Sequence, residues 1–396
     1  MRVLFVCHRF PFPPKRGGKI RPFNIISHLT RSGHDVTVCS LARDKDEAQA
    51  GDGIKEHCHA YHVSVTGKWL PIARMVLRLP TPVPASMGYF YTTELKGVID
   101  GLLQENQYDL IFVHCSSVAQ FVRHVQHVPK IIDFGDMDSQ KWQIYSSFKP
   151  FPLSVGYWYE GVRLEREEKR LARQFNLSTC TTKAELDTLN EYGAAHATGW
   201  FPNGVDATFF KPLGIEPETD AIGFVGRMDY YPNQLAMFDF CEEVLPLLRP
   251  AKPGLKLYII GAEPSAKVRA LGELDGVTVT GTVDDIRAYV QNCQLTVAPL
   301  EIARGTQNKI LESMAQEVPV VCSAQAAGGV DAVPAEHLLV ATSPQEYADH
   351  ILSLLNDPDY RGRLAKASRA RVLSNHDWQQ SMIRLDALIK SVVQTG

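Results

Sequence analysis

The chain lacks several features that would narrow its function at once. Its eight cysteines include no C-x-x-C pair and no closely spaced framework. No apolar run approaches the ~20 residues needed to cross a bilayer. There is no low-complexity tract and no internal repeat that would indicate a solenoid. A formal net charge of −3 gives no overall attraction to nucleic acid, so any anion site must be local.

The cysteines and the N-terminus bear on location. Several cysteines lie in apolar, strand-like runs, which predicts buried free thiols in a reducing compartment. The first apolar run is too short for a signal peptide and ends at His8 and Arg9. We therefore expect a cytoplasmic protein without a nucleic-acid partner, and peripheral contact with the inner face of the cytoplasmic membrane stays open.

The 396 residues are enough for two domains, and 45% hydrophobic with 21% charged residues is typical of a globular protein. Short apolar runs alternate with helical patterns, which predicts parallel sheets with crossover helices. The predicted strands are 3–7, 36–40, 110–114, 130–134, 177–181 and 199–201, then 222–226, 255–261, 277–280, 295–300 and 318–322. We expect an α/β protein with two doubly wound Rossmann-like domains facing across a cleft, residues 1–202 and 203–376, with a C-terminal helix at 377–396 that packs back on the first.

One stretch, Lys68 to Tyr91, fits neither pattern. It mixes aromatic and basic side chains with four prolines and has no strand or helix of convincing length. Three interpretations stay open: a mobile loop over an acceptor site, a membrane-facing patch, and a plain surface excursion.

The segment from Arg304 to Glu312 carries the clearest chemical pattern. It predicts a loop, a helix and then the buried strand 318–322. Gly305 would let a phosphate approach backbone N–H groups at the helix N-terminus, where the helix dipole favours negative charge. Lys309 can meet that phosphate, and Glu312 on the same helix face can accept two sugar hydroxyls. The alternative is an ordinary α/β unit in which Lys309 and Glu312 form a surface ion pair of little value.

Other candidates in the first half follow strands, where α/β proteins keep functional groups. Gly17 and Gly18 precede a helix and permit close approach of a ligand. They do not form G-x-G-x-x-G, which makes a NAD-dependent dehydrogenase a distant alternative. His114 ends a strand and could bind a sugar hydroxyl or exchange a proton, although structural histidines are more common.

In the second half, Gly226 and Arg227 follow a strand, and the planar arginine fork can clamp a diphosphate. After another strand, backbone groups from Gly281 to Val283 could hold a flat base.

Asp136 and Asp138 resemble a D-x-D metal pair. Two carboxylates are too few ligands for a predicted metal site, and capping of a helix by Asp138 or Ser139 is the simpler interpretation.

The order of these elements resembles the retaining glycosyltransferases of the GT-B fold, in the large bacterial group (glycosyl transferases group 1) that uses nucleotide-diphosphate sugars. The matching elements span nearly the whole chain: 17–18, 33–38, 114, 203–206, 226–227, 260–261, 281–283, 305–312 and 319–321. Segments 132–142 and 228–233 are similar to a narrower branch of sugar transferases associated with exopolysaccharide and exosortase loci.

That resemblance implies roles for the candidate residues. Arg227 and Lys309 would hold the donor diphosphate and neutralise the leaving group without a metal. Glu312 would bind the ribose, and His114 would line the donor sugar near the reacting carbon. It also implies a UDP- or GDP-type sugar donor, no further cofactor, and a polysaccharide or lipid-linked glycan acceptor. The residues assigned to catalysis are His114, Arg227 and Lys309, and those assigned to donor binding are Gly17, Gly18, Gly226, Arg227, Val283, Arg304, Gly305, Thr306, Lys309 and Glu312.

The chain departs from the family pattern at two places. Arg304 occupies the position, eight residues before Glu312, where the family usually has a second glutamate. The lysine that usually follows the arginine is missing, because residues 229–233 form that loop. Two other activities therefore stay open, namely a non-catalytic nucleotide-sugar-binding protein and a sugar-nucleotide epimerase of the same fold.

Overall fold

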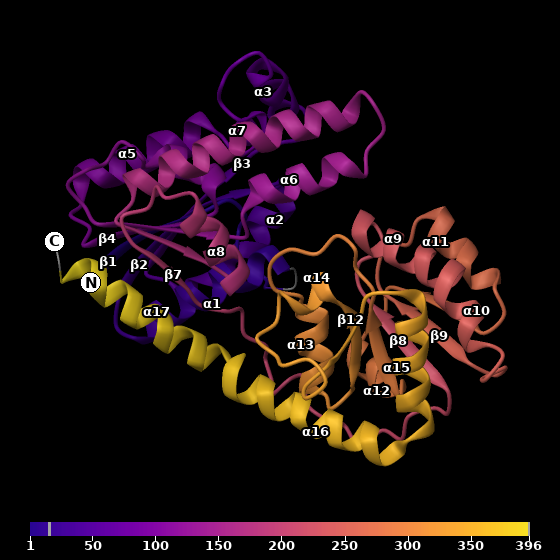
Figure 1. Cartoon of the computed structure of the whole chain (residues 1–396). Coiled ribbons are helices and arrows are strands. Elements are labelled where there is room, and N and C mark those ends of the chain that lie inside the picture. Colours follow the sequence, from indigo (N-terminus) through magenta and orange to yellow (C-terminus); the bar gives the residue numbers. More distant parts are fainter. Residues whose placement is uncertain (15–16, 395–396) are drawn as a thin grey trace. The chain divides into compact units, whose positions relative to one another are not determined.

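The computed structural model describes residues 1–14 and 17–394, and these form two compact units (Figure 1). Unit 1 contains residues 1–202 and the C-terminal segment from Met382, and unit 2 contains residues 203–381. Helix α17 (Trp378–Val393) runs through this division, so its first turn belongs to unit 2 and the rest to unit 1.

Unit 1 is built on a parallel sheet with the strand order β3-β2-β1-β4-β5-β6-β7. Its strands are β1 (Arg2–Cys7), β2 (Asp35–Ala42), β3 (Ala60–Val65), β4 (Leu110–His114), β5 (Lys130–Gly135), β6 (Leu177–Cys180) and β7 (Thr198–Trp200). Its helices are α1 (Gly17–Arg31), α2 (Lys45–Gln49), α3 (Leu70–Arg78), α4 (Ala85–Tyr89), α5 (Thr93–Glu105), α6 (Asp138–Ser147), α7 (Leu153–Gln174) and α8 (Lys183–Glu191), with 3-10 turns at Ala50–His57 and Ser116–Phe121. Strands β4 and β5 are buried throughout, as expected where helices cover both faces of a parallel sheet.

Unit 2 repeats this plan with the strand order β10-β9-β8-β11-β12-β13. Its strands are β8 (Ala221–Val225), β9 (Lys256–Ile260), β10 (Val277–Gly281), β11 (Leu295–Ala298), β12 (Val320–Ser323) and β13 (Leu339–Ala341). Its helices are α9 (Tyr231–Asp239), continued by a π-helical turn (Phe240–Val244) and α10 (Leu245–Leu248), then α11 (Ala266–Ala270), α12 (Ile286–Gln291), α13 (Asn308–Ala315), α14 (Ala324–Ala327), α15 (Pro344–Asn356) and α16 (Pro358–Asn375). A 3-10 turn (Leu271–Glu273) follows α11.

Every strand predicted from the sequence is present, and two more occur. Strands β3 and β13 each lie at an edge of their sheet, and β3 is largely half-exposed. Strand β3 mixes polar with apolar residues, and β13 is only 3 residues long, so the sequence signal of each is weak.

The stretch from Lys68 to Tyr91, for which we expected no helix of convincing length, contains α3 and α4. That expectation is wrong because Pro71 lies in the first turn of α3, where a proline removes no helical hydrogen bond. The other three prolines lie between the two helices and set their ends.

The eight cysteines are free and buried, as predicted. Within residues 1–14 and 17–394, no helix combines the length and the apolar character that spanning a bilayer requires.

Candidate functional site

In unit 1 the candidate site is centred on a histidine and a buried carboxylate at the ends of neighbouring strands. His114 is the last residue of β4, and its side chain is 7% exposed. Its Nδ1 lies 2.8 Å from Oδ2 of Asp133, which is fully buried on β5. The two residues are register partners in the parallel sheet, and this pairing brings their side chains together.

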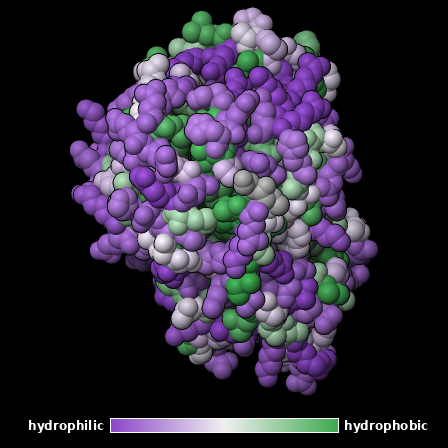
Figure 2. All heavy atoms as spheres, turned by 90° about the vertical axis from the view of Figure 1, so that its left-hand side faces the viewer, coloured by the Kyte–Doolittle hydropathy of each residue, from purple (hydrophilic) through white to green (hydrophobic). Residues whose placement is uncertain are grey.

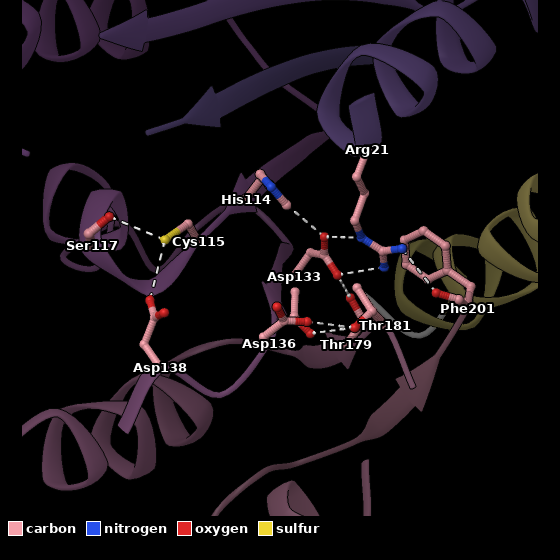
Figure 3. A network of polar contacts seen from close by, with 11 residues as sticks. Arg21, His114, Cys115, Ser117, Asp133, Asp136, Asp138, Thr179, Thr181 and Phe201 are labelled. Carbon is pink, nitrogen blue, oxygen red and sulfur yellow. Dashed lines mark hydrogen bonds and ion pairs between the residues drawn. The ribbon is translucent and has the colours of Figure 1, made fainter. Parts of the chain in front are cut away.

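Asp133 is also held from two other elements (Figure 3). Arg21, in α1, donates from Nε and Nη2 to the two carboxylate oxygens, at 2.8 Å each, and from Nη1 to the carbonyl of Phe201 at 3.0 Å. Thr179, on β6, donates its hydroxyl to Oδ1 at 2.9 Å. We call Arg21, His114, Asp133 and Thr179 the Asp133 network.

The Asp133 network determines which ring nitrogen of His114 faces the carboxylate as a donor. Burial alone would raise the pKa of Asp133, but the Arg21 guanidinium and His114 outweigh burial and hold the pKa of that carboxyl well below its usual range. An ionised carboxylate only accepts hydrogen bonds, so Nδ1 of His114 carries a proton. Nε2 is then the ring nitrogen that a ligand hydroxyl can contact, and the ring orientation is set in advance.

Two neighbouring residues mark the same edge of the sheet. Cys115, directly after β4, has a φ of 82°, a left-handed conformation that is costly for a non-glycine residue and concentrated at functional sites. His8, directly after β1, has its ring centroid 5.7 Å from that of His114. Burial lowers the pKa of His8, so this ring is neutral at pH 7.

Asp136 and Asp138 have separate partners (Figure 3). Asp136 accepts a hydrogen bond from Thr181 at 2.9 Å, and Asp138 lies 3.9 Å from the Cys115 thiol. The expected capping of α6 by Asp138 or Ser139 is wrong, because both residues lie inside the helix. In the part of the chain that the structure describes, no group of three or more His, Cys, Asp or Glu side chains is placed to hold a metal ion.

Gly17 and Gly18 open α1 and are exposed. A Cβ at Gly18 would come no closer than 3.7 Å to its nearest neighbour, the Arg9 side chain, which is an ordinary contact. Packing in unit 1 therefore does not require this glycine, and the predicted approach of a ligand stays a prediction.

In unit 2 the candidate site lies at the carboxyl end of β8. A Cβ at Gly226 would come within 2.6 Å of Nδ2 of Asn233 and 3.2 Å of Nζ of Lys309, so any side chain there would push these two groups from their places. Asn233, in α9, donates to the carbonyl of Arg227 at 2.8 Å and accepts from Nζ of Lys309 at 2.6 Å. The Lys309 ammonium also lies 4.5 Å from the centroid of the Phe224 ring.

Lys309 and Glu312 lie one turn apart on α13, and both have shifted pKa values. Loss of water around these half-buried side chains lowers the pKa of Lys309 to about 7 and raises that of Glu312 to about 7. Lys309 hydrogen-bonds to Asn233 rather than forming the exposed ion pair of the alternative interpretation. A cation and a carboxylate that are each partly dehydrated are typical of ligand sites.

Arg227 follows Gly226 as expected, but its guanidinium already has carboxylate partners. It donates to the two oxygens of Asp229 at 3.0 and 2.8 Å, and to Glu263 at 2.6 Å. Hydrogen bonding to Asp229 raises the pKa of Arg227. The side chain is 40% exposed, so a diphosphate can reach it but must compete with two carboxylates.

The loop before α13 has the features of an anion-binding turn. Gly305 has a φ of 65°, and its carbonyl would lie 2.1 Å from a Cβ at Gly329, so both positions need glycine. Gln307 precedes the helix without capping it through its side chain. Among the described atoms, Thr306 Oγ1 and Asn308 Oδ1 are buried without a hydrogen-bond partner. A ligand with phosphate and hydroxyl groups would satisfy such atoms and the uncapped N-terminus.

The remaining predicted residues lie in two loops of unit 2. Arg304 is half-buried before Gly305, and its carbonyl accepts a hydrogen bond from the Gln307 side chain at 3.1 Å. Val283 follows β10 and packs against a small buried cluster that contains Val225 and Ile260. The donor-site prediction is thus divided, with Gly17, Gly18 and His114 in unit 1 and the other residues in unit 2.

Sequence reasoning missed Arg21 and Asn233. Arg21 does carry a signal, because it lies on the buried stripe of α1 with Ile25 and Leu29, where a charge needs a buried partner. Asn233 carries none, since an asparagine after a proline in a polar segment is typical of an ordinary turn or helix start.

Solved structures with a similar arrangement of strands and helices show the fold class. The sucrose-phosphate synthase of Thermosynechococcus elongatus superposes with a TM-score of 0.74 at 16% identity, covering 100% of both chains. Anabaena HepE, crystallised in complex with UDP-glucose, gives a TM-score of 0.67 at 15% identity over 99% of this chain and 100% of that one. At this identity the likeness shows the fold alone, and that fold is the GT-B architecture with two Rossmann-like domains.

Both halves of the chain also match glycosyltransferase families. The family described as "Glycosyltransferase Family 4" matches residues 16–209, and the family described as "Glycosyl transferases group 1" matches residues 219–357. The chain is therefore built from two glycosyltransferase domains.

Two curated relatives are each 24% identical in sequence. They are the D-inositol 3-phosphate glycosyltransferase of Segniliparus rotundus, over 254 residues, and a GDP-mannose-dependent monoacylated alpha-(1-6)-phosphatidylinositol monomannoside mannosyltransferase of Corynebacterium glutamicum, over 249 residues. The alignments cover 58% and 56% of this chain and only 55% and 64% of the relatives' own lengths.

Proposed function

We propose that the chain transfers a sugar from a nucleotide-diphosphate donor to a polysaccharide or lipid-linked glycan, with retention of configuration and without a metal. One observation carries this proposal: the Lys309 ammonium is fixed by Asn233 beside Gly226, one turn before Glu312. A fixed cation next to an uncapped helix N-terminus stabilises the charge that develops on a leaving diphosphate. Glu312 then accepts the ribose hydroxyls of a UDP- or GDP-type donor.

In this proposal the Asp133 network serves the sugar. Nε2 of His114 contacts a hydroxyl near the reacting carbon, and Asp133 and Arg21 keep the ring from turning. The acceptor hydroxyl attacks from the face that the diphosphate leaves, and its proton passes to the departing phosphate oxygen. No separate general base is needed for that step.

The names of the relatives support both the donor and the acceptor. The Corynebacterium relative is named as GDP-mannose-dependent and for a phosphatidylinositol-linked acceptor, and HepE was crystallised with UDP-glucose. Membership of the exopolysaccharide- and exosortase-associated branch remains part of the proposal.

The first prediction concerns the donor base. A thermal-shift panel of UDP, GDP, ADP, CMP and NAD should raise the melting temperature with UDP or GDP and leave it unchanged with NAD, because only a ligand of the native state stabilises it. A shift with NAD alone would contradict the proposal.

A non-catalytic nucleotide-sugar-binding protein is the second candidate. Two observations favour it: the Arg227 guanidinium already donates to two carboxylates, and Arg304 stands at the usual glutamate position. The two candidates differ in turnover, since a transferase releases nucleoside diphosphate from the sugar donor when an acceptor is present and a binding protein releases none. An epimerase would instead interconvert the sugar nucleotide without an acceptor.

Binding of the donor should be coupled to uptake of a proton by one side chain and release of a proton by another. Lys309, with a pKa of about 7, should take up a proton when a diphosphate binds, so its contribution to affinity falls as pH rises above 7. Glu312, with a pKa of about 7, should release a proton when ribose hydroxyls donate to it, so its contribution to affinity rises as pH approaches 7 from below and is full above that value. Calorimetry in buffers of different ionisation enthalpy should show uptake for Glu312→Gln, release for Lys309→Met, and little net exchange for the unmodified protein. Equal exchange in all three would contradict both assignments.

A further inference from the structure

Helix α3 turns its apolar side chains to solvent and its basic side chains inward. Trp69 before the helix is 81% exposed and Leu77 is 73% exposed. The two arginines point the other way, since Arg74 donates to the carbonyl of Tyr91 and Arg78 donates to the side chain of Gln120 at 3.3 Å. A helix on the surface of a protein in water has the reverse arrangement.

Polar contacts at the end of α3 hold this orientation in place. Arg163, buried in α7, donates from Nη1 to the carbonyls of Arg78, Leu79 and Thr81 at 3.2, 3.1 and 2.9 Å. Buried charge-assisted hydrogen bonds of this kind are costly to break. The outward apolar face is therefore a feature of the folded unit.

A second group of exposed apolar side chains lies at the start of α7, the helix that also supplies Arg163 (Figure 1). Phe151, just before α7, is 82% exposed, and Leu153, Val155 and Trp158 are exposed along its first turns. Some separate hydrophobic side chains are visible at the upper edge of Figure 2, at the height of α3 in Figure 1. We call this the α3–α7 surface, formed by Trp69, Leu70, Ile72, Val76, Leu77 and Leu79 with Phe151, Leu153, Val155 and Trp158.

The segments that supply this surface carry no negative charge. No acidic residue occurs between Glu56 and Glu94, or between Asp138 and Glu160. Exposed Lys68 precedes α3, and half-buried Lys149 precedes α7. Tryptophan, phenylalanine and lysine around aliphatic side chains are the composition of a protein surface that enters the headgroup region of an anionic bilayer.

We propose that the α3–α7 surface docks unit 1 on an anionic lipid bilayer. The apolar side chains of α3 and of the start of α7 enter the boundary between headgroups and acyl chains, and the lysines lie against lipid phosphates. A basic protein partner would need carboxylates on this surface to bind to. The segments that supply the surface have none, so an anionic bilayer fits it better. The proposal goes beyond sugar transfer and does not depend on it, because docking needs neither donor nor acceptor.

Cosedimentation of the full chain with vesicles tests it. The unmodified protein should bind vesicles of phosphatidylcholine with added phosphatidylglycerol more strongly than phosphatidylcholine alone. Trp69→Ser with Leu77→Ser should weaken partitioning tenfold or more, since two large apolar side chains are lost from the bilayer. Lys68→Glu should remove much of the preference for the anionic lipid. The matched control, Leu373→Ser with Ile383→Ser, removes two exposed apolar side chains elsewhere and should bind as the unmodified protein does.

Two results would overturn the proposal. One is partitioning of the Trp69 and Leu77 double variant equal to that of the unmodified protein, and the other is no binding of the unmodified protein to anionic vesicles. A dimer in size-exclusion chromatography that this variant converts to a monomer, without vesicle binding, would assign the surface to a second copy of the chain. Thermal shifts with nucleotides, measured on the same samples, report on donor binding separately, so the two proposals can fail independently.

Discussion

Replacing Arg21 by methionine is expected to lower the free energy of unfolding of unit 1 by about 3–5 kcal/mol, because it leaves the Asp133 carboxylate buried without its charged partner. Unfolding in urea, followed by hydrogen exchange of the amides of β4 and β5, measures this loss. Sugar transfer should fall as well, because Arg21 no longer holds Asp133, the acceptor of the His114 Nδ1 proton, in place.

Two controls separate this effect from a general loss of charge. Arg21→Met combined with Asp133→Leu should recover much of the stability, since no buried charge remains unpaired. Lys55→Met, which removes an exposed partner of Asp52, should change nothing measurable. If Arg21→Met alone unfolds at the urea concentration of the unmodified protein, the network does not stabilise unit 1.

The pH dependence has a defined sign. The folded-state pKa of Asp133 is lowered, so the stability it contributes is full above the ordinary pKa of an aspartate and is lost as pH falls through and below that value. Without Arg21 the pKa of Asp133 rises. The free energy of unfolding should then fall less steeply as pH drops below the ordinary pKa of an aspartate.

The second large effect is expected at the donor site. Lys309→Ala should weaken binding of UDP or GDP by roughly tenfold to a hundredfold, which corresponds to the about 1.5–3 kcal/mol of a hydrogen bond to a charged group. Isothermal titration calorimetry measures it directly. Lys267→Ala is the matched control, because Lys267 is an exposed lysine of the same unit, on α11, and lies outside the site.

Two other substitutions at the donor site should weaken nucleotide binding less. Asn233→Ala should weaken binding less than Lys309→Ala, since it removes the group that positions the ammonium and leaves the charge. Arg227→Ala should also have the smaller effect, because Asp229 and Glu263 already compete for its guanidinium. Unchanged affinity in both Lys309→Ala and Arg227→Ala would rule out the phosphate clamp.

The sequence was enough to predict the two parallel sheets, because central strands such as β4 and β11 are short, mostly apolar runs between helical patterns. It was not enough for the edge strands β3 and β13 or for α3. The four prolines between Lys68 and Tyr91 suggested a loop, but only Pro71 lies within α3, and it lies in the first turn.

The sequence predicted the local patterns of the candidate sites but not their long-range contacts. The spacing of Gly305, Lys309 and Glu312 along one loop and helix is visible in a single sequence, and this spacing was enough to predict a ligand site. The contacts of Lys309 with Asn233 and of Asp133 with Arg21 join residues 76 and 112 positions apart, and only the folded chain brings them together. The Glu263 partner of Arg227 likewise comes from a separate loop, 36 positions further along the chain, whereas Asp229 is only 2 positions away.

Helix α17 has a consequence for how the protein is made. The part of α17 from Met382 completes unit 1, where Asp386 lies 2.8 Å from His28 of α1 and Leu388 packs against Gly199 on β7. On the ribosome, the residues of unit 2 are all synthesised before this helix can reach its place. Unit 1 therefore begins to form first and is finished last, and until then the surface that α17 covers is open to chaperones and to other nascent chains.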